Sequence, residues 1–260
     1  DFETWTQASC LSFRRDDVPP RRMEPHHNMA EEAHQGAMLW SRGNVIIGCY
    51  DMWHGNPMGE QNRIDMDLGL VVSNDALHYY EPIPDFKFVP YYEELEDGPP
   101  RLLQGQGFAN DGERSFFWYG VWRYEPPKTT GVRLATWPRD RFGSYSPTGE
   151  TAASNAAEDV ESCHCITCPF ELQANRAQVF VNVEGCSEHS RLTIEILDER
   201  LRPINGFGAS DCEPIAKDGF RVPVSWRGGD VMKGTDNPIR LKVNWEGLRA
   251  EDTKLFAFYV

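Results

Sequence analysis

Two carboxylates beside apolar strands are the first candidates for chemistry in this chain. Glu32 lies shortly before His34, and Asp51 follows the apolar residues 45–50. Hydrolysis of a glycosidic bond needs one carboxyl group as the acid and a second as the base or nucleophile. Desolvation in a cavity would raise the pKa of Glu32 toward that of a general acid. The alternative is that Glu32 is a solvated loop residue and that Asp51 caps a turn.

Aromatic, imidazole and amide side chains near these carboxylates would suit a sugar. Trp53 could stack on a sugar face, while His34 and His54 could bond to hydroxyl groups. Gln104 and Gln106 begin a second apolar strand, where their neutral amides also suit hydroxyls. The alternatives are that the histidines are structural and that the glutamines hold neighbouring strands together.

These residues belong to a pattern that repeats along the chain. Residues 35–53 and 104–122 each form a Gln-Gly segment, a turn and a strand ending in tryptophan. Further strands are expected at 68–79 and 132–142. A repeated four-strand unit is typical of a β-propeller blade. The repeat predicts propeller blades over residues 1–147, whose inner strands bring Glu32, His34, Asp51 and His54 to one central cavity.

The rest of the chain has a different texture. After a linker at 148–161, short strands with strict alternation, such as 191–197, predict a β-sandwich over residues 163–260. The chain as a whole is therefore expected to be all-β. Alternation predicts that one set of apolar side chains is buried in this sandwich: Ile194, Ile196, Val243, Trp245, Phe256 and Phe258.

Other aspartates and the cysteines allow more than one interpretation. Asp65 and Asp67 precede a buried strand, and one of them could supply a second carboxylate. Either could instead be a loop residue that accepts hydrogen bonds from backbone N–H groups. Asp75 and Asp140 recur at equivalent places, which favours a structural role. The cysteines of a C-x-C-x-x-C segment lack a nearby fourth zinc ligand, because the next cysteines, Cys186 and Cys212, lie far along the chain. We therefore expect a disulfide or buried thiols there rather than a metal site: Cys163, Cys165 and Cys168.

Composition limits the class of partner. The formal net charge is −14, from 40 acidic and 26 basic residues, which argues against nucleic acid and against an anionic membrane surface. No apolar run approaches the roughly 18 residues of a membrane-spanning helix. The opening residues look like the end of a repeat, so we expect earlier blades upstream or on a partner chain. Cofactor and localisation stay open, with secretion or the periplasm as options.

The segment Trp53-His54-Gly55-Asn56-Pro57 and residues 65–75 resemble blades of the five-bladed propeller glycosidases, which include invertases and arabinanases. A sandwich after the propeller is similar to the invertase arrangement. The resemblance implies a glycoside hydrolase, or part of one, acting on a polysaccharide or oligosaccharide. The family's first two inner-strand acids have no match here. The alternative is a non-catalytic carbohydrate-binding or structural propeller, with aromatics and amides but no carboxyl pair.

Overall fold

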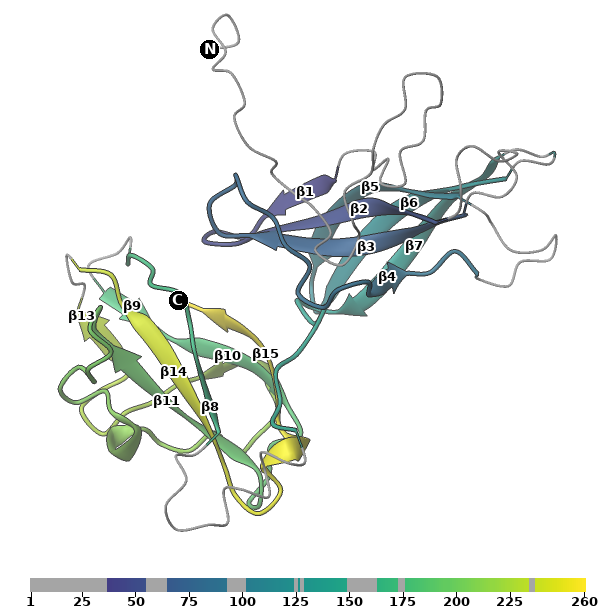
Figure 1. Cartoon of the computed structure of the whole chain (residues 1–260). Helices are drawn as coiled ribbons and strands as arrows, with labels where there is room; N and C mark the ends of the chain where they lie inside the picture. The colour runs from purple at the N-terminus through teal and green to yellow at the C-terminus, as the bar shows by residue number, and fades with distance from the viewer. Residues whose placement is uncertain are drawn as a thin grey trace, which may run out of the picture. The chain divides into compact units, whose positions relative to one another are not determined.

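The computed structural model describes residues 37–54, 65–92, 102–123, 126, 129–148, 163–172, 176–233 and 237–260. This described part consists of β-strands and loops with two short 3-10 helices, η2 (Ala209–Asp211) and η3 (Ala250–Asp252) (Figure 1). The predicted all-β class is confirmed. None of the helices found in these ranges is long and apolar enough to cross a membrane.

By its contacts the chain divides into two compact units. The N-terminal unit comprises Asp1–Asp111 and Phe116–Thr136, and the C-terminal unit comprises Gly112–Ser115 and Trp137–Val260.

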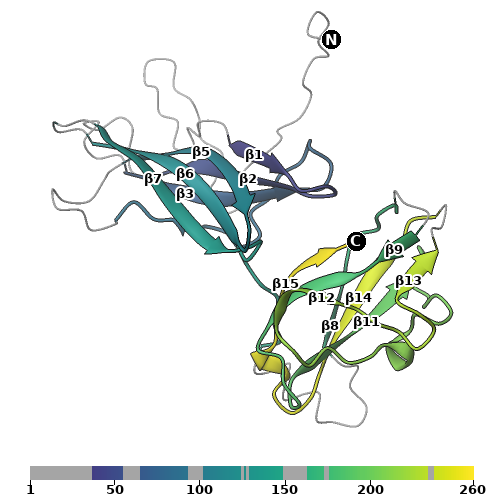
Figure 2. The ribbon, with the colours of Figure 1, turned by 180° about the vertical axis from the view of Figure 1, so that it is seen from behind.

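The strands of the first part of the chain form one sheet with the order β1-β2-β3-β5-β6-β7 (Figure 2). Strand β4 pairs with β3 (Figure 1). Both predicted hairpins are present, as β1–β2 and β5–β6. They belong to the same sheet, because β3 pairs in parallel with β5 at Met66 and Leu102. The described residues contain no closed sheet, so the propeller stays a prediction. The bounds of the strands are β1 (Met38–Ser41), β2 (Ile46–His54), β3 (Asp65–Ser73), β4 (Lys87–Val89), β5 (Leu102–Asp111), β6 (Arg114–Trp122) and β7 (Thr129–Pro138).

Large aromatic rings pack closely on both faces of the β2–β3 pair. Tyr50 lies over Gly69 so closely that a Cβ there would come within 2.4 Å of its Cε1 atom. Tyr50 and Met52 are fully buried on this face. On the other face, β5 lies against β1 and β2. There the ring of Phe108 lies between Trp40 and Phe117, with centroid distances of 5.5 and 4.4 Å.

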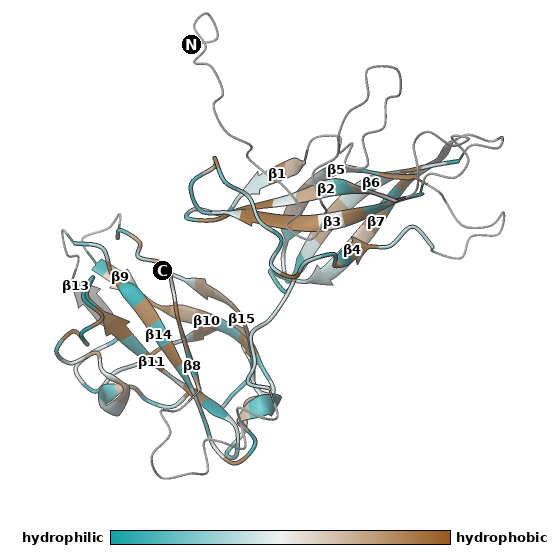
Figure 3. Ribbon diagram, viewed as in Figure 1, coloured by the Kyte–Doolittle hydropathy of each residue, from teal (hydrophilic) through white to brown (hydrophobic). Residues whose placement is uncertain are grey.

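The C-terminal unit holds two three-stranded sheets, β12-β10-β15 and β11-β14-β8, and the two-stranded sheet β13-β9. One hydrophobic cluster joins side chains from both three-stranded sheets, including Val181, Leu192, Val243 and Leu255. Figure 3 shows hydrophobic residues along β10, β11 and β14. The bounds are β8 (His164–Ile166), β9 (Arg176–Gln178), β10 (Phe180–Glu184), β11 (Arg191–Leu197), β12 (Gly219–Pro223), β13 (Val231–Lys233), β14 (Arg240–Glu246) and β15 (Lys254–Tyr259).

Most of the predicted core of this unit is buried. Ile194, Ile196, Val243 and Trp245 are buried as expected, but Phe256 and Phe258 are only partly buried. A register shift between β10 and β15 explains the position of Phe256, because Val181 faces Phe258 while Val183 faces Leu255. Leu255 therefore takes the core position next to Val183. Phe258, opposite Val181, packs against the hydrophobic cluster and is half-buried. Simple alternation would have placed Phe256 and Phe258 on one face.

The segment that follows β7 binds to the C-terminal unit. Arg141 donates from Nε to the side-chain oxygen of Asn182 at 3.0 Å. The Tyr259 hydroxyl donates to Asp140 at 2.8 Å, and the backbone of Tyr145 pairs with that of Leu255. These bonds make residues 139–145 part of the C-terminal unit.

Candidate functional site

Asp51 is the predicted catalytic carboxylate that the structure describes. It lies in β2 opposite Leu68 of β3, and only 3% of it is exposed. The backbone N–H of Gly105 donates a hydrogen bond to its carboxylate. Burial raises the pKa of Asp51 to about 7, against the smaller lowering effect of this bond. Asp51 would therefore be half protonated near neutral pH.

Gly105 is what brings the backbone of β5 close to Asp51. A Cβ on Gly105 would lie 3.0 Å from the ring of Phe117 and 3.3 Å from Met38. A side chain at this position would push β5 away, and with it the N–H that bonds to Asp51. The arrangement holds the N–H of Gly105 on the Asp51 carboxyl group and encloses that group in the sheet.

No second carboxylate joins Asp51 from β3. In the β2–β3 pairing, Asp67 faces Met52 and Asp65 faces His54, whereas Asp51 faces Leu68. Since neighbouring residues of a strand point to opposite faces, Asp65 and Asp67 lie on the other face of the sheet. Asp67 is held there by Lys87 at 3.1 Å and by the N–H of Tyr91 at 2.6 Å. Asp67 therefore accepts a hydrogen bond from a backbone N–H, as the structural alternative expected, but it does so from within strand β3 and not from a loop.

The other site residues predicted near Asp51 are described only in part. Glu32 and His34 lie outside the described residues. Trp53 and His54 end β2, opposite Met66 and Asp65, and their side chains are not among the described parts. The predicted meeting of Glu32, His34, Asp51 and His54 in one cavity stays a prediction.

An exposed row of aromatic residues on β6 was missed by the sequence analysis. Along this strand Phe117 and Tyr119 are buried, whereas Trp118 and Trp122 are 37% and 42% exposed. Phe116 is half-buried on the same face as Trp118, with ring centroids 6.0 Å apart and planes at 30°. The signal was present, because two-residue alternation places 116, 118 and 122 on one face. We call Phe116, Trp118 and Trp122 the aromatic row.

Gly120 interrupts this row and brings polar groups to it. A Cβ on Gly120 would lie 3.4 Å from Nε1 of Trp122 and 3.7 Å from Nε2 of Gln106. The indole N–H and the amide of Gln106 therefore flank the glycine on the same face. Gln106 is exposed, and Gln104 is half-buried two residues earlier in β5. The two glutamines that the sequence predicts to bind substrate therefore lie next to exposed aromatic rings.

The apolar surface continues onto β7, the next strand of the sheet. Its side chains Val132 and Leu134 are exposed. Within the aromatic row, and at Gln104, Gln106, Val132 and Leu134, no side chain is charged. We call this set of residues the exposed face. The nearest charge on the same side of β6 is Arg114, the first residue of the strand.

The aspartates with a predicted structural role have one. The carboxylate of Asp75 accepts hydrogen bonds from the N–H groups of Leu77 and His78 at 2.9 and 2.8 Å. The carboxylate of Asp140 accepts a hydrogen bond from the hydroxyl group of Tyr259. Both residues therefore hold turns or neighbouring strands.

The cysteines of the C-x-C-x-x-C segment are thiols and not disulfides. Cys163 and Cys165 are half-buried and Cys168 is exposed, and none of them forms a disulfide with another described cysteine. Burial, and next the proximity of Cys163, raises the pKa of Cys165 to about 11, which keeps its thiol protonated. Within the described ranges, no three His, Cys, Asp or Glu residues are grouped so that they could hold a metal.

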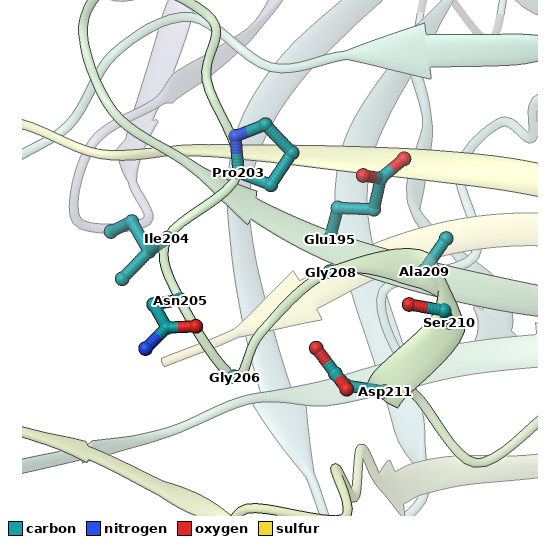
Figure 4. A pocket seen from close by; sticks show the side chains of 9 residues that line it. All are labelled: Glu195, Pro203, Ile204, Asn205, Gly206, Gly208, Ala209, Ser210 and Asp211. Atoms are coloured by element: carbon teal, nitrogen blue, oxygen red, sulfur yellow. The ribbon is translucent and has the colours of Figure 1, made fainter.

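A shallow pocket of about 460 Å³ lies in the C-terminal unit beside η2. Figure 4 shows Glu195 and Asp211 among its lining side chains, with Asn205 and Ser210. Glu195 is already engaged, because Asn244 donates to it at 3.1 Å and Lys242 lies 3.5 Å away. Its carboxylate therefore helps to hold β11 to β14.

No protein-family model matches this chain, and a comparison with curated proteins finds no match. The site must therefore be interpreted from its own residues.

Proposed function

We propose that the protein binds a neutral polysaccharide or oligosaccharide through the exposed face of the N-terminal unit. The observation that carries this proposal is the convergence of the Trp122 indole N–H and the Gln106 amide over Gly120, beside the exposed ring of Trp118. A sugar offers C–H groups to an aromatic ring and hydroxyls at its edge. Rings with adjacent donors and acceptors match both features.

The distribution of charge supports a neutral ligand. The chain carries a net charge of −14, which repels nucleic acid and acidic polymers. The exposed face itself has no charged side chain, so it offers no ion-pair partner to a charged ligand. An uncharged, hydroxyl-rich polymer is not repelled by the net charge and needs no ion-pair partner on the exposed face.

Affinity electrophoresis of the full chain in gels that contain neutral polysaccharides tests this function. We expect at least one polysaccharide to retard the protein. Trp122→Ala should weaken this binding roughly tenfold, or about 1.4 kcal/mol, because it removes a stacking ring and a donor. Tyr145→Ala, which removes an exposed ring from the C-terminal unit, is the control and should bind normally. Equal retardation of Trp122→Ala and wild type would refute the proposal.

A second candidate is glycoside hydrolysis, which one observation favours. Asp51 has a pKa near 7, the value that suits a general acid at neutral pH. Its enclosure in the sheet argues for binding as the first choice, since a catalytic acid must touch its substrate. If the protein is a hydrolase, Asp51→Asn or Glu32→Gln should lower turnover on the order of a hundredfold or more. Unchanged activity in both variants would exclude these residues as catalysts.

The finer fold assignments are proposals as well. Two sheets around one cluster support a β-sandwich for residues 163–260. Two hairpins of like order support propeller blades in residues 1–147, related to the five-bladed propeller glycosidases, although β3 and β5 pair in one sheet. An experimental structure with the hairpins in two separate blades would establish the propeller. A single continuous sheet would exclude it.

A further inference from the structure

We infer that the Asn205–Gly206 pair of the C-terminal unit is a site of covalent self-modification, at which Asn205 is converted to aspartate and isoaspartate. The reaction consumes only water, and it is independent of the carbohydrate binding proposed above. Both residues line the pocket beside η2, on the loop that leads from β11 to this short helix (Figure 4). The pair is the only Asn-Gly sequence in the chain.

The chemistry is the attack of a backbone nitrogen on the side chain that precedes it. The amide nitrogen of Gly206 loses its proton and forms a bond to Cγ of Asn205, while the bond from Cγ to the side-chain nitrogen breaks. The side-chain nitrogen takes up a proton and leaves as ammonia, and a five-membered succinimide remains. Water then opens this ring. Opening at Cγ gives aspartate, and opening at the backbone carbonyl carbon gives isoaspartate.

Both reacting groups are available in the folded protein. The side chain of Asn205 is exposed and forms no hydrogen bond with any part of the chain that the structure describes. The N–H of Gly206 donates to no backbone oxygen of the described loops, whereas the N–H groups of Ile204 and Phe207 on either side of the pair are bonded. The attack therefore requires no hydrogen bond of either group to break first.

Gly206 also removes the steric obstacle that a side chain would place at the attacking nitrogen. Its φ of +84° lies in the left-handed region that favours glycine, and apart from its chain neighbours no atom lies within 4 Å of the position of a Cβ. Asn74 is the contrast among exposed asparagines. Asp75 follows it, and its amide donates to the backbone oxygen of Asn44 at 3.1 Å.

Conversion adds a negative charge to a pocket that already contains acidic groups. Glu195 and Asp211 line this pocket, and a carboxylate at position 205 would be the third in its lining. Like charges in one pocket repel each other. The modified loop should therefore be held less firmly than the original one.

Isoaspartate changes the backbone of the loop as well. It adds an extra carbon to the main chain ahead of Gly206, within the turn that the N–H of Phe207 closes on the oxygen of Ile204 at 2.9 Å. The oxygen of Phe207 accepts a bond from Ile196 of β11 at 3.0 Å, and its ring packs against Trp226 with centroids 5.3 Å apart. Since this segment is tied to the core, its modification should lower the stability of the C-terminal unit.

Incubation of the full chain in neutral buffer made with oxygen-18 water, followed by digestion in ordinary water, tests the inference. Peptide mass spectrometry reads each asparagine separately, and hydrolysis of the succinimide leaves an oxygen-18 atom in the product. We expect Asn205 to convert roughly tenfold or more faster than Asn74 in the folded protein. Conversion should be faster in mildly alkaline than in mildly acidic buffer, because the attacking nitrogen must lose a proton.

A pair of glutamine variants separates this site from general ageing of the protein. Asn205→Gln keeps an amide but would have to close a larger ring, so it should remove the acidic species that isoelectric focusing detects in incubated protein. Asn74→Gln is the matched control at an exposed asparagine and should leave that species unchanged. Incubated wild type that contains isoaspartate should unfold at a lower urea concentration than fresh protein.

The opposite results would overturn the inference. Equal conversion of Asn205 and Asn74, or an acidic species that persists in Asn205→Gln, would show that the pair is not a preferred site. Conversion of Asn205 in urea-unfolded protein only would show that the folded loop keeps the two groups apart. An equal urea midpoint for fresh and modified protein would overturn the effect on the fold.

Discussion

The tryptophans of the two units are used in opposite ways. In the C-terminal unit, Trp226 and Trp245 are each 3% exposed, and their indole N–H groups donate to backbone oxygens at 2.9 and 3.0 Å. In the N-terminal unit, Trp118 and Trp122 are 37% and 42% exposed. The first pair is committed to the fold, so its removal should affect stability. The second pair presents its rings to solvent, so its removal should affect binding.

One buried polar group from each unit shows a similar contrast. In the C-terminal unit, Asn182 accepts a bond from Arg141 and donates to the backbone oxygen of Arg139. This amide is neutral and bonded at both ends. In the N-terminal unit, Asp51 is an ionisable group whose burial raises its pKa. A buried carboxyl of this kind costs stability when charged, so its presence calls for a reason other than packing.

The largest expected loss of stability follows from removing the buried tryptophan of β14. Trp245→Ala should lower the free energy of unfolding by about 3–5 kcal/mol, because it leaves a cavity and an unpaired backbone oxygen. Trp118→Ala should cost less, about 1–2 kcal/mol, because the ring is already 37% exposed although it contacts Phe116. Urea denaturation of both variants measures the contrast. Comparable losses in the two would break the distinction between structural and surface tryptophans.

The next effect concerns the pH dependence that Asp51 imposes. Its pKa rises from 3.8 in the unfolded chain to about 7 in the fold, so the folded protein holds the proton more tightly between these values. The contribution of Asp51 to stability is therefore full below pH 3.8 and is lost as the pH rises through 7.

Asp51→Asn removes this titration and keeps an acceptor for Gly105. The stability of the variant relative to wild type should rise from pH 4 to pH 8, by a few kcal/mol at most. Thermal unfolding across this range measures the difference. A difference that is constant with pH would show that Asp51 titrates normally in the fold.

Alanine substitution at two glycines of the N-terminal unit should change the free energy of unfolding by different and smaller amounts. Gly69→Ala should cost about 1–3 kcal/mol, because the added Cβ would lie 2.4 Å from Tyr50. Gly107→Ala has open space and should be close to neutral. Denaturation midpoints of the pair provide the measurement. A neutral Gly69→Ala would contradict the close packing of Tyr50 on β3.

The smallest effect tests the attachment of residues 139–145 to the C-terminal unit. Arg141→Lys keeps the charge but loses the planar group that reaches both Asn182 and Glu184. We expect a loss of about 1 kcal/mol in unfolding free energy, measured by urea denaturation. A more stable variant would argue that these bonds do not hold the segment.

Alternation made much of the fold predictable from the sequence. The repeat gave a strand at 68–79, of which residues 68–73 lie in β3 (Asp65–Ser73) and the rest do not lie in a strand. Alternation gave the strand at 191–197, which the structure has as β11 (Arg191–Leu197). It failed at Phe256, because a register shift between β10 and β15 exchanges the inward position. Such a shift depends on a partner strand that lies far along the chain.

The candidate site was less predictable for a related reason. Alternation alone could have placed Trp118 and Trp122 on one face of β6. The position of Gln106 beside Gly120 depends on how β5 and β6 pair, and the burial of Asp51 depends on the approach of Gly105. Contacts between strands of this kind are not visible in the local pattern of either strand.

Oxidation of tryptophan by N-bromosuccinimide, with and without a bound neutral polysaccharide, tests the central claim most directly. Peptide mass spectrometry reads each indole separately, and the buried Trp226 and Trp245 are internal controls. We predict that Trp118 and Trp122 react readily in the free protein and are protected at saturating polysaccharide, while both controls react slowly throughout. Reaction of Trp118 and Trp122 at the same rate in free and polysaccharide-bound protein would contradict the exposed face as the binding site.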